Sequence, residues 1–332
     1  MKKTLSLLVV VLASSAAGAQ GRGAWTLRDC IDYALEHNIS LQQQALQVQQ
    51  QALQLSTSKG SRLPSVSASG SENFSFGRGL TADNTYSNTN TTSTGLNLGA
   101  SVPLYQGLRI KNTIRQDELN LKAVTADFER AKEDVSMNVA QAYVQILYNM
   151  EMLSVAKSQV AIDSLQVERL AGMLENGKAS PAQVAQQKAA LGQSRLSATQ
   201  AENNLKLALL DLSQLLELPS PEGFMIVKPS TDLEGIIIPD PERVYSDALL
   251  AKPAVKAEEL RLDASDYAIK VAKGAYLPSV SASGGIGSNY YTMSSAPSTS
   301  FADQMKNNFS QFLGLSVSVP IFNGYQTRRS EE

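Results

Sequence analysis

Leu63–Gly70 reads Leu-Pro-Ser-Val-Ser-Ala-Ser-Gly, and Leu277–Gly284 repeats the same eight residues in the same order, 214 positions later. Farther along, Val102–Gly107 has a similar counterpart in Val319–Gly324, now 217 positions later. The two offsets differ by three residues, which one difference in loop length would explain. Because chance explains an identity of eight residues very poorly, the repeat indicates an internal duplication of the chain.

Each copy of the repeated stretch begins a segment in which apolar and polar residues alternate. In the first copy one face is apolar and the other is mostly serine: Val66, Ala68, Gly70, Phe74 and Phe76 against Ser65, Ser67, Ser69, Ser71, Asn73 and Ser75. Residues 96–105, 280–286 and 313–321 alternate in the same way. This pattern is typical of outer-membrane barrel strands, although a half-buried soluble sheet alternates identically. Four strands are predicted, with polar loops at residues 78–94 and 290–308 that we expect to face the cell exterior.

Helical periodicity precedes each strand pair, from about residue 26 to residue 59 and from about residue 242 to residue 273. A much longer helix is predicted after the second strand, because residues 107–172 contain no proline and no internal glycine. Read as one helix, this segment reaches about 100 Å at 1.5 Å per residue. Apolar residues, many of them alanine, recur there at helical spacings, as a packed coiled coil requires.

A turn is predicted to end the long helix near residue 177. Gly177 suits the C′ position of a helix, Ser180 the N-cap of the next helix and Pro181 its first position. A return helix is expected from Pro181 to Glu217. The two helices would form a long hairpin, and a spectrin-like soluble bundle is the alternative that this pattern leaves open.

The first nineteen residues have the layout of a cleaved secretory signal, with two lysines, a short apolar run and small residues before Gln20. A retained anchor is the alternative. No later stretch is a candidate transmembrane helix, so any membrane crossing is expected to be made by strands. The remaining organisation is predicted as a first repeat at 20–217, a proline-rich linker at 218–241 and an incomplete second repeat at 242–332.

The composition argues against several classes of function. The 29 basic and 31 acidic residues form no basic clusters, which argues against nucleic-acid binding. The single cysteine, Cys30, and the single histidine, His37, are too few for a structural zinc centre, and we expect a packed thiol and a structural imidazole. The acidic pairs Asp117–Glu118 and Glu133–Asp134 are expected to be solvated or to face a lumen. No catalytic, cofactor or metal site is predicted, so the chain is not expected to be an enzyme.

Four membrane strands do not close a barrel by themselves, since single-chain barrels begin at about eight strands. An open sheet edge in lipid leaves backbone groups unsatisfied, at several kcal/mol each. The chain is therefore expected to oligomerise. Two copies would supply eight strands around a filled interior, whereas three copies would supply twelve strands with room for a pore.

Several short motifs occur in one order over essentially everything after the predicted signal: Trp25-Thr26-Leu27, Ala34-Leu35, Asn38, Leu63-Pro64, Val102–Gly107 and Gly177–Ser180. In this order and duplication they resemble the TolC-like outer-membrane efflux family. The resemblance implies an α+β membrane protein, built from a duplicated unit of helix, two barrel strands and a long coiled-coil helical hairpin. It further implies a homotrimer in the lipid bilayer, with a twelve-stranded barrel on an α-helical periplasmic tunnel and no cofactor.

The resemblance also implies partners in the periplasm and the inner membrane. Gly177, Lys178, Ala179 and Ser180 match the hairpin tip that meets a periplasmic adaptor in that family; alternatively, these four residues merely build a turn. The adaptor would be fed by an inner-membrane pump or by the ABC exporter of a type I secretion system. The family's second hairpin has no counterpart here. A complete second copy would end near position 434, so we expect a C-terminal truncation of about a hundred residues.

The function expected from the sequence is passive conduction through the outer membrane, as the channel component of a tripartite efflux or type I secretion system. The helical part would lie in the periplasm. A soluble periplasmic helical-hairpin adaptor or structural protein is the main alternative, and a porin-like uptake channel is a third.

Overall fold

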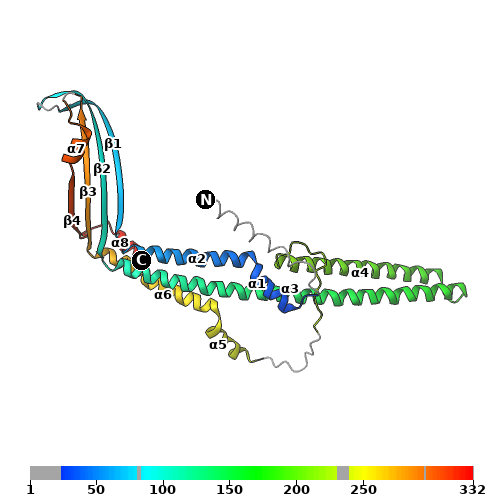
Figure 1. Cartoon of the computed structure of the whole chain (residues 1–332). Helices are drawn as coiled ribbons and strands as arrows, with labels where there is room; N and C mark the ends of the chain where they lie inside the picture. The colour runs from blue at the N-terminus through cyan, green and yellow to red at the C-terminus, as the bar shows by residue number, and fades with distance from the viewer. Residues whose placement is uncertain (1–23, 81–83, 230–238, 295–296, 332) are drawn as a thin grey trace, which may run out of the picture. The chain divides into compact units, whose positions relative to one another are not determined.

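The computed structural model describes residues 24–80, 84–229, 239–294 and 297–331 of the chain (Figure 1). The predicted signal at residues 1–19 lies outside this described part, as does the apolar run Ile236–Ile238 of the predicted linker.

Packing divides the chain into two compact units. The first contains the described residues up to Leu46 and those of Phe128–Lys252, and the second contains Gln47–Asp127 and those from Pro253 onward. Both units draw on both predicted repeats, because the first unit includes the start of the second repeat up to Lys252 and the second unit includes Gln47–Asp127 of the first repeat.

The predicted first helix is two helices, α1 (Leu27–His37) and α2 (Ile39–Gly60). Helix α1 begins with a capping box, in which Thr26 accepts from the Asp29 N–H and the Asp29 carboxylate accepts from the Thr26 N–H. Asn38 has an extended backbone, with ψ of 124°, and its side-chain oxygen accepts from the Leu41 N–H at 3.3 Å. The asparagine therefore ends one helix and caps the next, which the periodicity did not reveal.

The long helical hairpin is confirmed as α3 (Arg109–Glu175, 67 residues) and α4 (Pro181–Leu215). Helix α3 continues through Gly172 to Glu175, so it ends where the sequence predicted the break, at Asn176 and Gly177. A helix of this length measures about 100 Å. Helices in proteins gain most of their stability from tertiary packing, and in the first unit α3 packs against α1 and α4.

The core of the first unit lies where α1, α3 and α4 meet residues of the predicted linker. Its largest fully buried side chains are Ile146, Leu212, Leu216, Val139, Cys30 and Ser213. Phe224 and Ile226 are also buried there, and Trp25 pairs with Ile226 in a parallel bridge. The Tyr143 hydroxyl contacts the carbonyl oxygens of Trp25 and Val227. The beginning of the predicted linker is thus part of the core rather than a bare connection.

The second repeat begins with two helices where one was predicted: α5 (Pro241–Ala251), in the first unit, and α6 (Pro253–Lys273), in the second. Lys252 between them is extended, with ψ of 123°. The reason is local, because proline disfavours a helical conformation at the residue before it. A short 3-10 turn, η2 (Gly274–Tyr276), follows α6.

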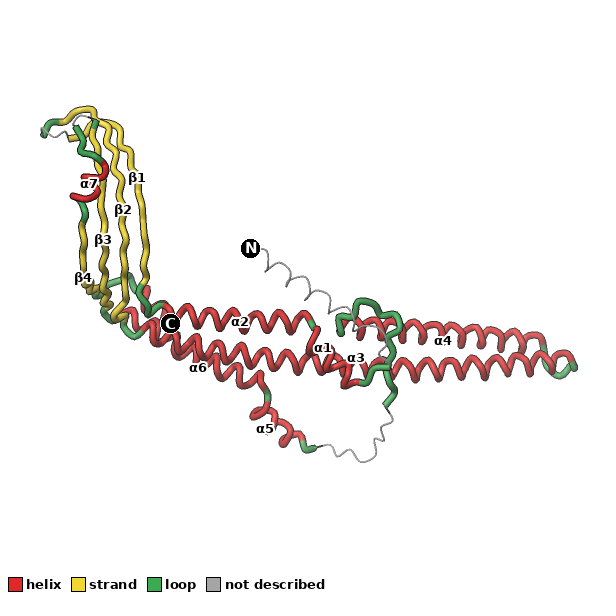
Figure 2. Tube along the Cα trace, in the orientation of Figure 1, coloured by secondary structure: helices red, strands yellow, loops and turns green. Residues whose placement is uncertain are grey.

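The second unit contains one antiparallel sheet, β1 (Ser65–Leu80), β2 (Tyr86–Gln106), β3 (Ser279–Met293) and β4 (Ser310–Ser318), in that spatial order (Figure 2). The central pair, β2 with β3, joins the two sequence copies. Register places Ala68 beside Leu98 and Leu98 beside Ile286. The predicted alternation is confirmed, because these pairings bring most apolar residues of the four strands to one face; Phe312 of β4, opposite Gly285, lies on the other face.

The predicted loops at residues 78–94 and 290–308 are wrong in extent. Strand β1 continues to Leu80 and β2 begins at Tyr86, so most of the first stretch is paired strand. The second stretch contains the end of β3 and a helix, α7 (Phe301–Asn307). Threonine-rich polar segments are compatible with strands, and polarity alone did not separate a strand from a loop.

The duplication is visible in the backbone where strands give way to helices. After β2, Gly107 and Leu108 have φ of +60° and +63°; after β4, Gly324 and Tyr325 both have φ of +63°. The helices that follow are α3 and α8 (Gln326–Glu331). Two successive left-handed residues turn the chain in each copy, and a leucine or tyrosine in this conformation carries strain.

Candidate functional site

The predicted tip, Gly177–Ser180, forms the connection between α3 and α4. The Lys178 N–H donates to the Met173 carbonyl at 2.8 Å, and the Gly177 N–H donates to the Leu174 carbonyl at 2.9 Å. Gly177 has φ of +70°. These two bonds and this conformation define a Schellman motif, which satisfies carbonyl groups at the end of α3. The predicted C′ position of Gly177 is confirmed.

The start of α4 is equally well defined. The Ser180 side chain accepts from the Gln183 N–H at 3.2 Å, and the Gln183 side chain accepts from the Ser180 N–H at 2.8 Å. Pro181 occupies the first turn. This is a capping box with proline at the position where its missing N–H is harmless. The predicted N-cap is confirmed, and the turn is held at both ends by hydrogen bonds to the backbone.

The surface that this turn presents is small and polar. Gly177, Lys178 and Ser180 are exposed, whereas Ala179 is half-buried. A Cβ atom added at Gly177 would meet no atom within 4 Å. The tip therefore offers a rigid turn with one cation just beyond the C-terminus of α3, where the helix dipole favours positive charge. Such a surface can contact another protein but has no group arranged for chemistry.

A buried carboxylate lies farther along the hairpin, between α3 and α4. Asp163 of α3 accepts hydrogen bonds from Ser194 of α4, from Gln159 at 3.2 Å and from Gln187 of α4 at 3.4 Å. The Ser194 hydroxyl, followed by the Gln159 amide, holds the pKa of this carboxyl below its ordinary value. No signal in the sequence marked Asp163, because two of its three partners come from the returning helix.

We expect the Asp163 contact to make the hairpin acid-sensitive. Its folded-state pKa lies below the unfolded value of about 4, so the stabilisation is complete above that value and is lost as the pH falls through the folded-state pKa. Asp163→Asn should lower the thermal midpoint of helix unfolding at pH 7. Between pH 5 and pH 2 the midpoint should then decrease less in the variant than in the unmodified chain. The control Asp211→Asn changes an exposed carboxylate on α4. Equal acid sensitivity in both variants would contradict this assignment.

The adjacent acidic residues of α3 have different environments. Asp117 is buried and accepts from the Ser58 hydroxyl of α2, so the expectation that it is solvated is wrong. Glu118 beside it pairs with Arg115 at 3.1 Å and lies 3.9 Å from Lys59. The correction has a simple reason: α2 packs on this face of α3 in the second unit and supplies the hydroxyl.

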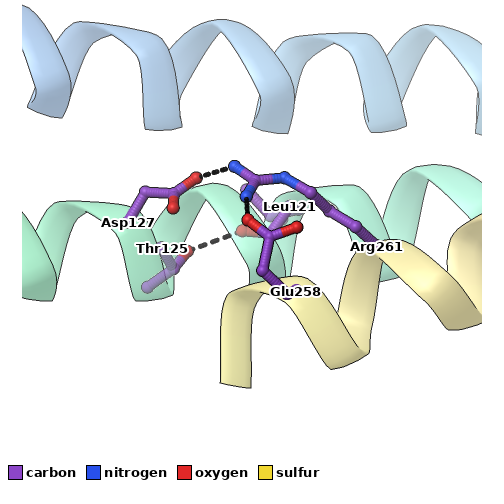
Figure 3. A network of polar contacts seen from close by, with 5 residues as sticks. All are labelled: Leu121, Thr125, Asp127, Glu258 and Arg261. Atoms are coloured by element: carbon purple, nitrogen blue, oxygen red, sulfur yellow. Dashed lines mark hydrogen bonds and ion pairs between the residues drawn. The ribbon is translucent and has the colours of Figure 1, made fainter. Parts of the chain in front are cut away.

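Two other carboxylates of α3, Glu133 and Asp127, form ion pairs with residues of the second repeat. Glu133 pairs with Lys252 at 2.8 Å in the first unit. In the second unit, Arg261 of α6 bridges Asp127 of α3 and Glu258 of its own helix (Figure 3). Partly exposed pairs of this kind contribute about 1 kcal/mol or less. They tie helices of the second repeat to α3 and do not form an acid–base site.

The two residues that could have suggested chemistry are structural. Cys30 is fully buried in the first core, as predicted. Burial raises the pKa of its thiol to about 12, and the Asp29 carboxylate adds to the rise. His37 stacks on Tyr33 with ring centroids 4.0 Å apart. Throughout the described ranges, no three His, Cys, Asp or Glu side chains gather where they could hold a metal ion.

The apolar face of the sheet is the second candidate surface. Its large side chains are exposed in the single chain: Val66, Phe74, Phe76, Leu96, Leu98, Ile286, Leu313, Leu315 and Val317. Leu313 is 90% exposed and Phe76 is 76% exposed. Glu72 lies on the same face, opposite Thr94. A largely apolar face, with serine on the other side of β1, suits contact with lipid.

No helix in the part of the chain that the structure describes is both long and apolar enough to cross a membrane.

Comparison with known proteins gives a family match. The model of the family described as "Outer membrane efflux protein" matches residues 30–217 and 244–331. The matched ranges cover most of the chain, including the hairpin, its tip and all four strands.

Three curated relatives are similar over much of this chain. The outer membrane efflux protein BepC of Brucella suis biovar 1 (strain 1330) is 22% identical over 99% of this chain and 69% of its own length. The fusaric acid resistance protein FusA of Burkholderia cepacia is 26% identical over 77% of this chain and 46% of its own length. The cation efflux system protein CusC of Escherichia coli O157:H7 is 26% identical over 90% of this chain and 61% of its own length. The chain thus spans about half to two thirds of these relatives.

Solved structures show the same fold. The CusC structure aligns with a TM-score of 0.74 at 21% identity, over 95% of this chain and 71% of that one. The CmeC outer membrane channel of Campylobacter jejuni aligns with a TM-score of 0.76 at 23% identity, over 92% of this chain and 63% of that one.

Proposed function

The chain belongs to the outer membrane efflux protein family, and on that premise we propose that it forms a passive channel through the outer membrane as the exit component of a tripartite efflux or type I secretion system. Three copies would close a twelve-stranded barrel that continues into a helical tunnel in the periplasm. Energy would come from an inner-membrane pump or ABC exporter, because the described residues contain no site that we can assign to chemistry.

The single observation that carries this proposal is the four-stranded sheet with an apolar face. Among the described strands, β1 and β4 are the outer ones, and each pairs with one neighbour only. In lipid, backbone groups on such edges must find partners, since each unsatisfied group costs several kcal/mol. Pairing β4 of one copy with β1 of the next satisfies both edges. Three copies supply the twelve strands that leave room for a pore.

Exposed apolar residues at heptad spacing on the helices support assembly. Ile39, Leu46 and Leu53 of α2 lie seven residues apart and are 53–69% exposed in the single chain. A second series of exposed residues at the same spacing lies on α3: Tyr148, Val155 and Ile162. Apolar residues every seven positions are typical of helices that pack side by side. In a tunnel wall, helices of neighbouring copies would cover them.

The polarity of the wall follows from the strand register. If the apolar face of the sheet meets lipid, the opposite face lines the barrel interior. On β1 that face carries small uncharged side chains: Ser65, Ser67, Ser69, Ser71, Asn73 and Ser75. Such a surface is wet and discriminates weakly between solutes. Selectivity would then reside mainly in pore width and in the pump that supplies the cargo.

Conductance and oligomeric state test the proposed channel together. We expect the full chain to require detergent for extraction, to have the mass of a trimer and to produce stepwise currents in planar lipid bilayers. The same preparation with the apolar face altered by Leu313→Asp and Leu315→Asp should lose bilayer insertion, whereas Ser67→Asp and Ser69→Asp on the opposite face should retain it. Extraction as a monomer without detergent would instead support the periplasmic adaptor alternative.

A further inference from the structure

Helix α7 lies beside the end of β3 that leads to Met293. It continues the line of β4, which lies beside the other end of β3 (Figure 2). Strand β4 has nine residues and pairs with β3 only as far as Gly287, opposite Ser310. Strand β3 itself continues to Met293. The edge of β3 beyond Gly287 therefore has no partner in β4, and α7 fills that place.

Gln304 of α7 and Asn308 just after it form the hydrogen bonds there that a strand backbone would form. The Gln304 amide donates to the Tyr291 carbonyl at 2.9 Å and accepts from the Tyr291 N–H at 2.9 Å. Just after the helix, the Asn308 amide donates to the Asn289 carbonyl at 2.7 Å. Tyr291 and Asn289 are two residues apart, and their bonded backbone groups point to the side of β3 where β4 pairs. Bonds to every second residue on one side of a strand are the pattern of an antiparallel ladder. Two amide side chains thus continue the ladder beyond the end of β4.

The helix is anchored to β3 on one side and polar on the other. Phe301 packs edge-on against Tyr290, with ring centroids 5.1 Å apart, and the Ser288 hydroxyl donates to the Met305 carbonyl at 2.6 Å. Asp303 and Lys306 are exposed. A charged helix surface offers no row of backbone groups to an incoming strand, and covering an edge in this way prevents strand addition.

The lengths and sequences of β1 and β4 do not by themselves fix the register in which β4 of one copy would pair with β1 of the next. Strand β1 has 16 residues and β4 has nine, so β1 could pair with β4 in several positions. The inner half of β1 is built mainly from serine, alanine and glycine, whose side chains specify register weakly. A slip of one residue would place serine toward lipid and apolar residues toward the interior.

We propose that α7 is an end stop for strand pairing between copies. It limits the free edge on this side of the sheet to Ser310–Ser318, so the residues of β1 from a second copy that extend beyond β4 lie beside α7, and this contact sets the register in which β1 pairs with β4. The inference rests on the proposed assembly of copies, and it assigns the outer limit of their shared interface to Gln304 and Asn308.

Disulfide cross-linking tests this register in the assembled full chain. In a Cys30→Ala background, Ala68→Cys is combined in turn with Leu313→Cys, Leu315→Cys and Val317→Cys, all on the apolar face. We expect one pair to dominate the covalently linked copies after mild oxidation. With Gln304→Ala and Asn308→Ala added, that product should fall at least twofold while another pair rises.

Two further variants separate the end stop from a folding defect. Asn307→Ala, at an exposed position of the same helix, should leave the cross-linking pattern unchanged. Gln304→Glu keeps an acceptor for the Tyr291 N–H but loses the donor to its carbonyl, so an intermediate pattern is expected. An unchanged register in the Gln304 and Asn308 double variant would overturn the end stop alone. Absence of every cross-link, in all backgrounds, would overturn the proposed assembly and this inference with it.

Discussion

Gly107→Ala should destabilise the junction between β2 and α3 by about 2–5 kcal/mol. Gly107 has φ of +60°, where a non-glycine residue costs about 1–2 kcal/mol. An added Cβ would also overlap the carbonyl oxygen of Gly274 and lie 2.8 Å from the Leu277 Cβ. Because the first of these obstacles is backbone, a rotamer change does not relieve it, and overpacking typically adds about 1–3 kcal/mol. We expect a lower thermal midpoint in detergent and a smaller yield of assembled protein.

The duplication supplies a matched control for this variant. Gly324 occupies the equivalent position in the second copy, has φ of +63° and would place its Cβ in open space. Gly324→Ala therefore tests the cost of the left-handed conformation without the steric overlap, and it should lower the free energy of unfolding by only about 1–2 kcal/mol. Equal losses in the two variants would show that the close approach of Gly107 to Gly274 contributes nothing.

Gly177→Asn should reduce binding of the hairpin tip to the proposed periplasmic adaptor at least tenfold while leaving the turn intact. Asparagine tolerates the left-handed conformation that Gly177 adopts. Its side chain would stand in open space at the tip, since nothing lies within 4 Å of the Cβ position. A partner that packs closely on Gly177 would then be displaced, whereas a turn with no contact role would be unaffected. The proposed adaptor contact and the simple turn thus predict different results.

Photo-cross-linking in cells measures this effect. A photoreactive residue at Lys178 should link to a periplasmic adaptor, and the yield should fall at least tenfold in Gly177→Asn. Gly223→Asn is the control, because Gly223 also has positive φ, of +77°, and open space at its Cβ position, but lies far along the chain from the tip. Undiminished linking in Gly177→Asn would mean that Gly177 only builds the turn.

Local sequence was sufficient for the hairpin and its turn. Gly177 and Ser180 form hydrogen bonds to residues at most a few positions away, and Pro181 suits the first turn because it lacks an N–H. Their residue types and spacing were therefore enough to predict a C′ position, an N-cap and a first helical position. The strand alternation was equally readable, because a period of two residues decides which face each side chain takes.

Non-local partners account for the buried side chains that the sequence did not predict. Asp117 is buried because α2 packs over it with Ser58, and Asp163 is buried because α4 returns beside it with Ser194. Phe224, in a proline-rich stretch that reads as a linker, is buried against α1 and Trp25. Spacing along one helix contains no information about a side chain that arrives from another element.

The sequence by itself determined the duplication, the long hairpin, its capped turn and the apolar face of each strand. The hairpin, the turn and the strand faces depend on residues near one another along the chain, and the duplication is a direct comparison of letters. Only the tertiary structure decided that β2 pairs with β3 across the two copies, and that α7 closes the outer edge of β3 through Gln304. Strand order and edge protection arise from backbone groups brought together over long sequence separations. Backbone N–H and C=O groups are nearly the same in every residue, so the sequence does not indicate which of them will pair.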